Sequence, residues 1–160
     1  MIHHLSISAE NPLHVAQILA EILQGKPTPH PFSPGGYIVF TFDDYGTEIE
    51  VYPLGIEVAP GNNEELRAYL QNPATSKFTA THAFISVPIS AEQIEQIAAR
   101  EGWLIQRPEF GFDYIMFWLE NRILIELLPP EMNAEYMAFV RPENLRKYFT
   151  FFESQDAPKD

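Results

Sequence analysis

The sequence predicts an α+β protein in which two βαβββ modules form an open, cup-shaped mixed sheet, followed by a helical C-terminal extension. One observation behind this prediction is that the order strand, helix, strand, strand, strand occurs twice within the 160 residues. The other is that short sequences recur at the start and end of each pattern. The opening His4-Leu5-Ser6-Ile7 matches His82-Ala83-Phe84-Ile85, and the ending Ile49-Glu50-Val51 matches Ile125-Glu126-Leu127.

The first pattern begins with residues 2–8, which alternate in hydrophobicity as a strand does. Asn11-Pro12 then starts a helix at 13–23, which Gly25 ends. The Pro-rich residues 26–36 allow at most a short edge strand. Two further strands are predicted at 37–43 and 47–53, with a turn at 44–46 between them.

The second pattern has the same order. Residues 81–87 form a strand, and Ser90 caps a helix that Gly102 ends. Three strands are then predicted at 103–106, 112–119 and 122–128, of which the last two are joined by a turn at Glu120-Asn121.

We expect one domain over residues 1–153. It is divided into a first module at 1–59, a connection at 60–78 with a short helix around 64–70, a second module at 79–130 and a helical extension at 131–153. Within the extension, 134–140 and 143–152 have a helical pattern, and 154–160 is predicted to be a flexible tail.

Composition narrows the range of functions. The net charge of −12 and the scattered Lys and Arg residues argue against nucleic-acid binding. The sequence has no apolar run long enough to cross a membrane and no secretory signal, so we expect a cytoplasmic protein. It also has no cysteine, so a metal ion would have to be bound by His, Asp or Glu.

The period of two in the strands places His4, Glu50, His82 and Glu126 on the face opposite the aliphatic core. The core face comprises Leu5, Ile7, Ile49, Val51, Ile85, Val87, Ile123, Ile125 and Leu127. Two imidazoles and two carboxylates are ligands that a divalent transition metal accepts, so a metal site built from a duplicated module is the leading hypothesis.

Other side chains share these faces and are candidates for substrate binding: Tyr52, Phe84, Arg122 and Leu124. For Phe84 and Leu124, ordinary sheet packing explains the pattern equally well. Arg122 either meets a substrate carboxylate at the rim of the cup or balances Glu120 and the acidic surface.

With its two His-containing openings and two Ile-Glu endings, the chain resembles the vicinal oxygen chelate superfamily, which includes glyoxalase I, extradiol dioxygenases and bleomycin-resistance proteins. The resemblance covers roughly residues 2–130. It implies that His4, Glu50, His82 and Glu126 are the metal ligands and that Glu50 or Glu126 moves a proton. The Pro-rich segment and the extension after Asn133 depart from the family pattern.

The resemblance implies a lyase or isomerase of the glyoxalase type, which uses Ni, Zn, Co or Mn on a small molecule with adjacent oxygens. Two alternatives stay open. An extradiol dioxygenase would hold Fe(II) with His4, His82 and Glu126, whereas a relative of the bleomycin-resistance proteins would bind a small molecule without metal. The aromatic residues of the C-terminal extension also predict a homodimer, because they need a surface to pack against.

Overall fold

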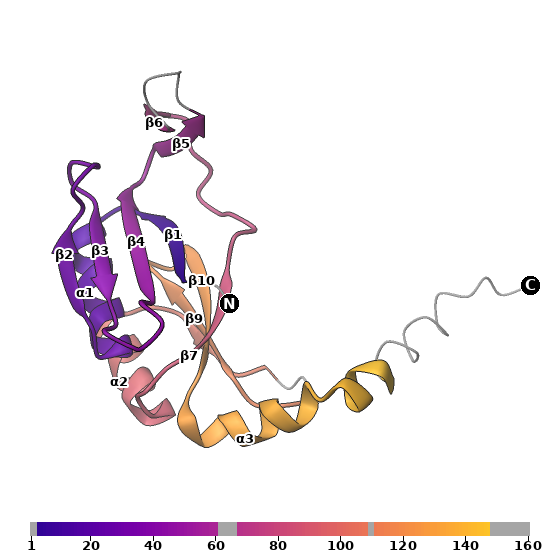
Figure 1. Ribbon diagram of the computed structural model, residues 1–160. Coiled ribbons are helices and arrows are strands. Elements are labelled where there is room, and N and C mark those ends of the chain that lie inside the picture. The colour runs from indigo at the N-terminus through magenta and orange to yellow at the C-terminus, as the bar shows by residue number, and fades with distance from the viewer. Residues whose placement is uncertain (1–2, 61–66, 109–110, 148–160) are drawn as a thin grey trace, which may run out of the picture.

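The computed structural model describes residues 3–60, 67–108 and 111–147. These residues form two four-stranded mixed sheets, a two-stranded hairpin and helices, and neither sheet closes into a barrel (Figure 1). The predicted α+β class, with two open βαβββ units, is therefore confirmed.

The first sheet has the strand order β1-β4-β3-β2. Its strands are β1 (His4–Ala9), β4 (Glu48–Pro53), β3 (Tyr37–Phe40) and β2 (Lys26–Pro29). Strand β1 runs parallel to β4, and the other neighbours are antiparallel. As the prolines predict, β2 is a short edge strand, where a missing N–H removes no bond from the middle of the sheet.

The second sheet repeats this topology in the order β7-β10-β9-β8. Its strands are β7 (Ala83–Ser86), β10 (Ile123–Leu128), β9 (Ile115–Leu119) and β8 (Ile105–Gln106). The predicted turn between β9 and β10 is present. Glu120 and Asn121 both have φ of 52°, as a two-residue turn between right-handed twisted strands requires.

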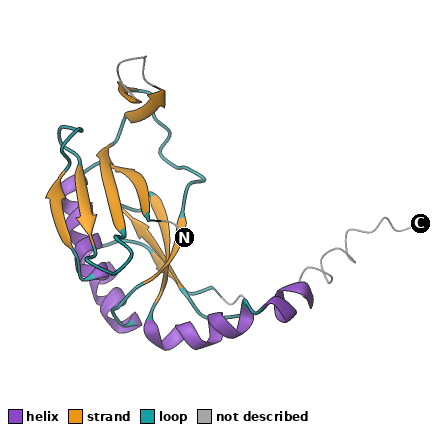
Figure 2. Ribbon diagram, viewed as in Figure 1, coloured by secondary structure: helices purple, strands orange, loops and turns teal. Residues whose placement is uncertain are grey.

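A helix follows the first strand of each unit. Helix α1 (Pro12–Leu23) begins after Asn11, whose side chain accepts a hydrogen bond from the His14 backbone N–H. Helix α2 (Ala91–Glu101) begins with a capping box between Ser90 and Gln93 and ends at Gly102, in a left-handed conformation with φ of 67°. Figure 2 shows these two helices lying beside the sheets, whereas the last helix runs away from them towards the C-terminus.

The two units share one hydrophobic core. It contains most of the aliphatic side chains that alternation assigned to the covered face, among them Ile49 and Val51 from β4 and Ile125 and Leu127 from β10, while Leu5 and Ile85 pack partly buried against it. The side chains at positions between these residues point to the opposite face, where the candidate ligands lie.

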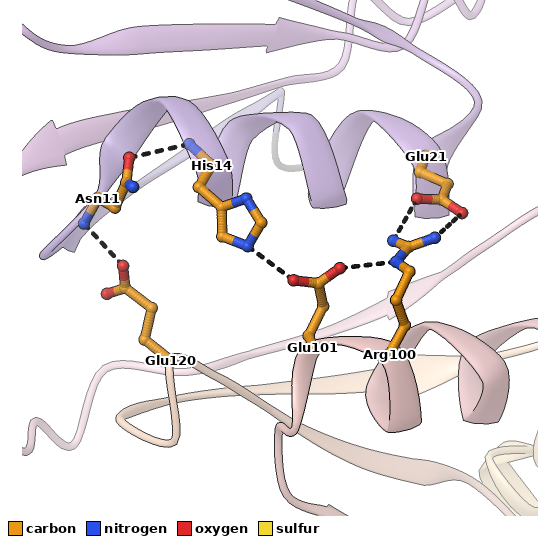
Figure 3. A network of polar contacts seen from close by, with 6 residues as sticks. All are labelled: Asn11, His14, Glu21, Arg100, Glu101 and Glu120. Atoms are coloured by element: carbon orange, nitrogen blue, oxygen red, sulfur yellow. Dashed lines mark hydrogen bonds and ion pairs between the residues drawn. The ribbon is translucent and has the colours of Figure 1, made fainter.

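Polar contacts join the two units beside this core (Figure 3). Glu101 of α2 accepts a bond from Arg100 and lies 2.7 Å from His14 Nε2 of α1. Arg100 also donates to both carboxylate oxygens of Glu21 at the other end of α1. Glu120, in the β9–β10 turn, accepts the backbone N–H groups of Glu10 and Asn11.

The prediction of a short helix around 64–70 is wrong for residues 67–70, the part of this range that the structure describes. Strands β5 (Ile56–Pro60) and β6 (Arg67–Gln71) pair antiparallel as a separate hairpin, and the intervening residues 61–66 lie outside the described residues. Pairing with β5 overrides the local helical pattern, because it satisfies the backbone groups of both strands. The hairpin projects beyond the end of the first sheet (Figure 1).

The C-terminal helix starts earlier than expected. Helix α3 (Pro130–Phe139) has Pro130 at its first position, where the missing N–H is harmless. Residues 142–147 are also helical, while the remainder of the expected second helix and the tail at 154–160 lie outside the described residues. None of the helices in the described part of the chain is long and apolar enough to span a membrane.

Candidate functional site

The two parallel strand pairs place the candidate ligands at equivalent positions. In the first unit, His4 lies opposite Glu48 and Ser6 opposite Glu50. In the second unit, Glu126 lies opposite Phe84, the residue that corresponds to Ser6. The duplicated spacing therefore corresponds to a duplicated backbone arrangement, but the neighbours of the two glutamates differ.

Glu50 lies in a buried polar cluster and is 6% exposed. Ser6 Oγ donates a hydrogen bond of 2.6 Å to Glu50 Oε2, and Tyr52 Oη donates one of 3.0 Å to the same oxygen. Glu50 Oε1 faces His30, whose Nε2 is 3.5 Å away. We call Ser6, His30, Glu50 and Tyr52 the Glu50 cluster.

His30 and Ser6 are members of the Glu50 cluster that the sequence does not predict as site residues. His30 lies in the loop after β2 but is only 7% exposed. Its Nδ1 accepts the Phe32 backbone N–H at 3.1 Å, so the ring hydrogen of the neutral form lies on Nε2. This Nε2 is 3.1 Å from Tyr52 Oη and can donate to it. Hydrogen bonds thus run from His30 through Tyr52 to the carboxylate.

The Glu50 cluster favours an ionised carboxylate. Burial by itself would raise the pKa of Glu50, but the hydrogen bonds from Ser6 and Tyr52 and the charges of His4 and His30 outweigh it and lower the pKa. The pKa of Tyr52 is raised strongly, first by burial and then by its hydrogen bonds with Tyr69 and Glu50. Tyr52 therefore stays protonated and remains a donor.

In the second unit, His82 and Glu126 form a more open pair. His82 Nε2 is 3.9 Å from Glu126 Oε2, and His82 is half exposed. The other ring nitrogen, Nδ1, is 2.9 Å from the Ala80 carbonyl oxygen, which can only accept a hydrogen bond. In the neutral ring the lone pair of Nε2 is then free to face the carboxylate, as in histidines that bind metals.

The structure does not gather the four predicted ligands into one group. No set of three or more His, Asp or Glu side chains among residues 3–60, 67–108 and 111–147 is close enough to hold one metal ion. His4 and His82 do line the same cavity of about 400 Å³. The carboxylate beside His4 Nδ1 is Glu48, at 3.9 Å, which the alternation of β4 places on the same face as Glu50.

The donor set still suits a divalent ion. Imidazole and carboxylate are ligands for Mn, Co, Ni and Zn, and His82 has its Nε2 turned to Glu126 by a backbone carbonyl. In the pairs His4–Glu48 and His82–Glu126, the nitrogen and the oxygen are 3.9 Å apart, which leaves room for one metal ion to bind both atoms.

The predicted substrate-binding residues fall into different surroundings. Tyr52 belongs to the Glu50 cluster, and Leu124 is half-buried on β10 opposite Trp118. Phe84 packs against the rings of Tyr136 in α3 and Tyr114, with centroid distances of 4.9 and 5.5 Å. Sheet and helix packing therefore accounts for Phe84. Burial, followed by the charge and hydrogen bonding of Glu126, raises the pKa of Tyr114.

The structure does not pair Arg122 with Glu120, and the binding of a substrate carboxylate by Arg122 stays a prediction. The side chain is 3% exposed, so it does not lie at a rim. Glu120 accepts the N–H groups before α1 instead of pairing with it. Arg122 turns towards the end of β1 and donates to Ser8 O and Ser8 Oγ, and it also donates to Lys77 O in the connection.

No protein-family model matches the sequence. The comparison with curated proteins found no match either. Solved structures do match. The fosfomycin resistance protein FosX from Listeria monocytogenes, crystallised with Mn(II) and sulfate, has a TM-score of 0.54 and 13% identity, covering 92% of this chain and 96% of its own.

Two further structures give the same fold. The fosfomycin resistance protein FosX from Mesorhizobium loti has a TM-score of 0.50 and 8% identity, covering 79% of this chain and 88% of its own. A glyoxylase/bleomycin resistance protein/dioxygenase domain from Frankia sp. EAN1pec has a TM-score of 0.50 and 14% identity, covering 79% and 94%. These are structures of the vicinal oxygen chelate superfamily, so the resemblance predicted from the sequence is confirmed for the fold.

Proposed function

We propose that the protein is a divalent-metal-dependent lyase or isomerase of the glyoxalase type, acting on a small molecule with adjacent oxygens. The observation that carries this proposal is the pair His82–Glu126, in which Nε2 faces Oε2 at 3.9 Å. FosX from Listeria monocytogenes, which has the same fold, forms a complex with Mn(II), and this supports a metal of the same kind here.

In this proposal His4, Glu50, His82 and Glu126 hold the ion. When bound, the ion would act as a Lewis acid towards two adjacent oxygens of the substrate. Two carboxylates balance the charge of a divalent ion, and two histidines complete a set of four protein ligands.

The chain's own residues supply the proton transfer. Glu50 is ionised at neutral pH, consistent with its lowered pKa, and its carboxylate can therefore accept a proton from substrate, although the lowered pKa makes it a weaker base. Ser6 and Tyr52 both donate to Oε2 and fix the orientation of the carboxylate. Oε1 is the oxygen that these two hydrogen bonds leave for the metal ion or, when Glu50 moves off the ion, for the reacting proton. Glu126, beside Tyr114, is the corresponding group in the second unit.

A second copy of the chain completes the site in this proposal. The described part of one chain brings no three candidate ligands together, although the same ligand positions occur in both units. In a homodimer, the first unit of one protomer would face the second unit of its partner, giving a cup for a small-molecule substrate. A monomeric mass by light scattering across micromolar concentrations would contradict this arrangement.

Metal analysis of untagged protein tests the proposed function. After reconstitution with Mn, Ni, Co or Zn, we expect stoichiometric metal that His82→Ala removes. The matched control is His3→Ala, because the exposed His3 ring contacts the Tyr45 carbonyl oxygen rather than a candidate ligand. Proton exchange at the α-carbon of an α-hydroxycarbonyl compound in D₂O, followed by NMR, should depend on the same metal and on Glu50. Unchanged metal content in His82→Ala would refute the site.

One observation favours a second candidate. Because Glu50 is held by Ser6 and Tyr52, it can stand aside from the metal, leaving His4, His82 and Glu126 as the triad suited to Fe(II) in an extradiol dioxygenase. Oxygen uptake with catechol by the Fe(II)-loaded protein, undiminished in Glu50→Gln, would favour this second function. If no metal binds after reconstitution, the metal-free binding protein is favoured instead.

A further inference from the structure

We propose that a cavity beside Arg122 binds an organic anion, with the Arg122 guanidinium as its positive charge. The cavity has a volume of about 400 Å³ and is lined by the end of β1, by β5 and by the connection that follows β6. Among the lining residues are Ser6, Ser8, Tyr52, Thr79 and Arg122. Its size suits a small metabolite rather than a single ion.

Arg122 is a buried cation whose hydrogen-bond partners in the described part of the chain are all neutral. It donates to Ser8 O at 2.6 Å, to Ser8 Oγ at 3.1 Å and to Lys77 O at 3.1 Å. The Nε atom is buried and has no hydrogen-bond partner among the described residues. No carboxylate forms an ion pair with Arg122 in that part of the chain, and the residue is 3% exposed.

A buried positive charge without a negative partner is unfavourable by several kcal/mol, and buried charges in proteins are usually paired. The bonds to Ser8 and Lys77 explain the placement of the guanidinium, since they tie the connection to β1. They leave its charge uncompensated. An anion in the adjoining cavity would compensate it, and an arginine fork suits carboxylate and phosphoryl oxygens.

The remaining walls of the cavity suit the same ligand. Ser8, Thr79 and Thr81 offer hydroxyl groups that can donate to an oxyanion, and Phe78 adds apolar surface. One acidic side chain, Glu57, also lines the cavity, and its Oε1 accepts a bond of 2.6 Å from Asn72. Glu57 would weaken anion binding and therefore offers a test.

The cavity also reaches the Glu50 cluster, because Ser6 and Tyr52 line it and both donate to Glu50. A ligand anchored by its anionic group near Arg122 would extend towards Glu50. That this ligand is the substrate rests on the proposed function; the binding of an anion does not. The substrate would then carry a carboxylate or phosphoryl group in addition to its adjacent oxygens.

Calorimetric titration of chelator-treated, metal-free protein at low ionic strength tests the inference. The probes are lactate for carboxylates and methylphosphonate for phosphoryl groups, with glycerol as the neutral control. We expect saturable binding of at least one anion and none of glycerol. Glu57→Gln should tighten anion binding about threefold by removing a like charge. The control Glu95→Gln, on α2 and paired with Arg107, should leave it unchanged.

Arg122→Gln should weaken anion binding at least about tenfold, provided that circular dichroism shows a folded protein. If that variant does not fold, Glu57→Gln decides. The inference is overturned if the wild type binds neither anion at millimolar concentrations, or if Glu57→Gln binds the anion as the wild type does. Anion binding by a protein that takes up no metal would reject the proposed function and keep this inference.

Discussion

The two units have the same strand order and place a glutamate at the same position, yet they surround it differently. Glu50 is buried and receives hydrogen bonds from Ser6 and Tyr52. Glu126 lies opposite Phe84, which has no hydroxyl, and its tyrosine neighbour is Tyr114. The substitution of Phe84 for Ser6 removes a donor and supplies a surface for α3. The backbone repeat therefore sets where a carboxylate lies, and its neighbours decide what it does.

The difference extends to the access of ligands. Phe84 and Phe112 of the second unit pack against Tyr136 of α3, with centroid distances of 4.9 and 5.1 Å, so the helix covers part of that face. The corresponding region of the first unit adjoins the cavity beside Arg122. The first unit thus adjoins the cavity beside Arg122, while α3 covers part of the corresponding face of the second unit.

The largest effect on this comparison is expected from Phe84→Ala. Phe84 joins β7 to α3 and to Tyr114, so its loss should lower the free energy of unfolding by about 2–4 kcal/mol. Phe42→Ala, at a side chain that is 74% exposed, is the control and should change it little. Urea denaturation of both variants measures the difference. If both variants lose the same free energy of unfolding, the contacts of Phe84 with Tyr136 and Tyr114 do not hold α3 in place.

A smaller effect separates the two glutamates. Glu50→Gln replaces an acceptor of two buried hydrogen bonds and should destabilise the metal-free protein by about 1–3 kcal/mol. Glu126→Gln should change the stability by less than about 0.5 kcal/mol, because Glu126 is partly exposed. The measurement is urea denaturation at pH 7 after chelation. The same loss in both variants would show that the two units are equivalent after all.

Tyr52→Phe tests the donor side of the Glu50 cluster. It removes the hydroxyl that donates to Glu50 and lies 3.1 Å from His30 Nε2, so we expect a loss of about 1 kcal/mol in unfolding free energy. Tyr114→Phe is the matched variant in the second unit and should have a smaller effect. Thermal or urea denaturation distinguishes them, and a larger loss in Tyr114→Phe would reverse the contrast between the units.

The sequence predicts those features that depend on neighbours along the chain. Alternation along β4 and β10 places Ile49 and Ile125 in the core and Glu50 and Glu126 on the other face. The caps of α2 and the turn at Glu120-Asn121 are also local signals, and each appears where it was expected.

Features that depend on distant contacts were missed. His30 is in a loop, and only the fold brings it to Glu50, 20 positions further along the chain. Arg122 carries a charge that normally indicates exposure, but the backbone acceptors of Ser8 and Lys77 keep it buried. The β5–β6 hairpin likewise depends on pairing across residues 61–66 rather than on local propensity.

The smallest expected effect concerns the contact between the units. Glu101 binds Arg100 on its own helix and His14 on α1 (Figure 3). The hydrogen bond from Arg100 lowers the pKa of Glu101, burial opposes this, and His14 lowers it further. Because the folded-state pKa lies below the ordinary value of 4.5, Glu101 stabilises the fold above that pH. This contribution is lost as the pH falls through the folded-state pKa.

Glu101→Gln should therefore lower the unfolding free energy at pH 7 by at most about 1 kcal/mol, and the difference from wild type should shrink as the pH is lowered below 4.5. Glu95→Gln, whose ion pair with Arg107 lies within the second unit, is the control and should have a smaller effect. Urea denaturation from pH 7 to pH 3 checks both variants. A difference that persists unchanged at the lowest pH would mean that Glu101 joins the two units by packing rather than by its charge.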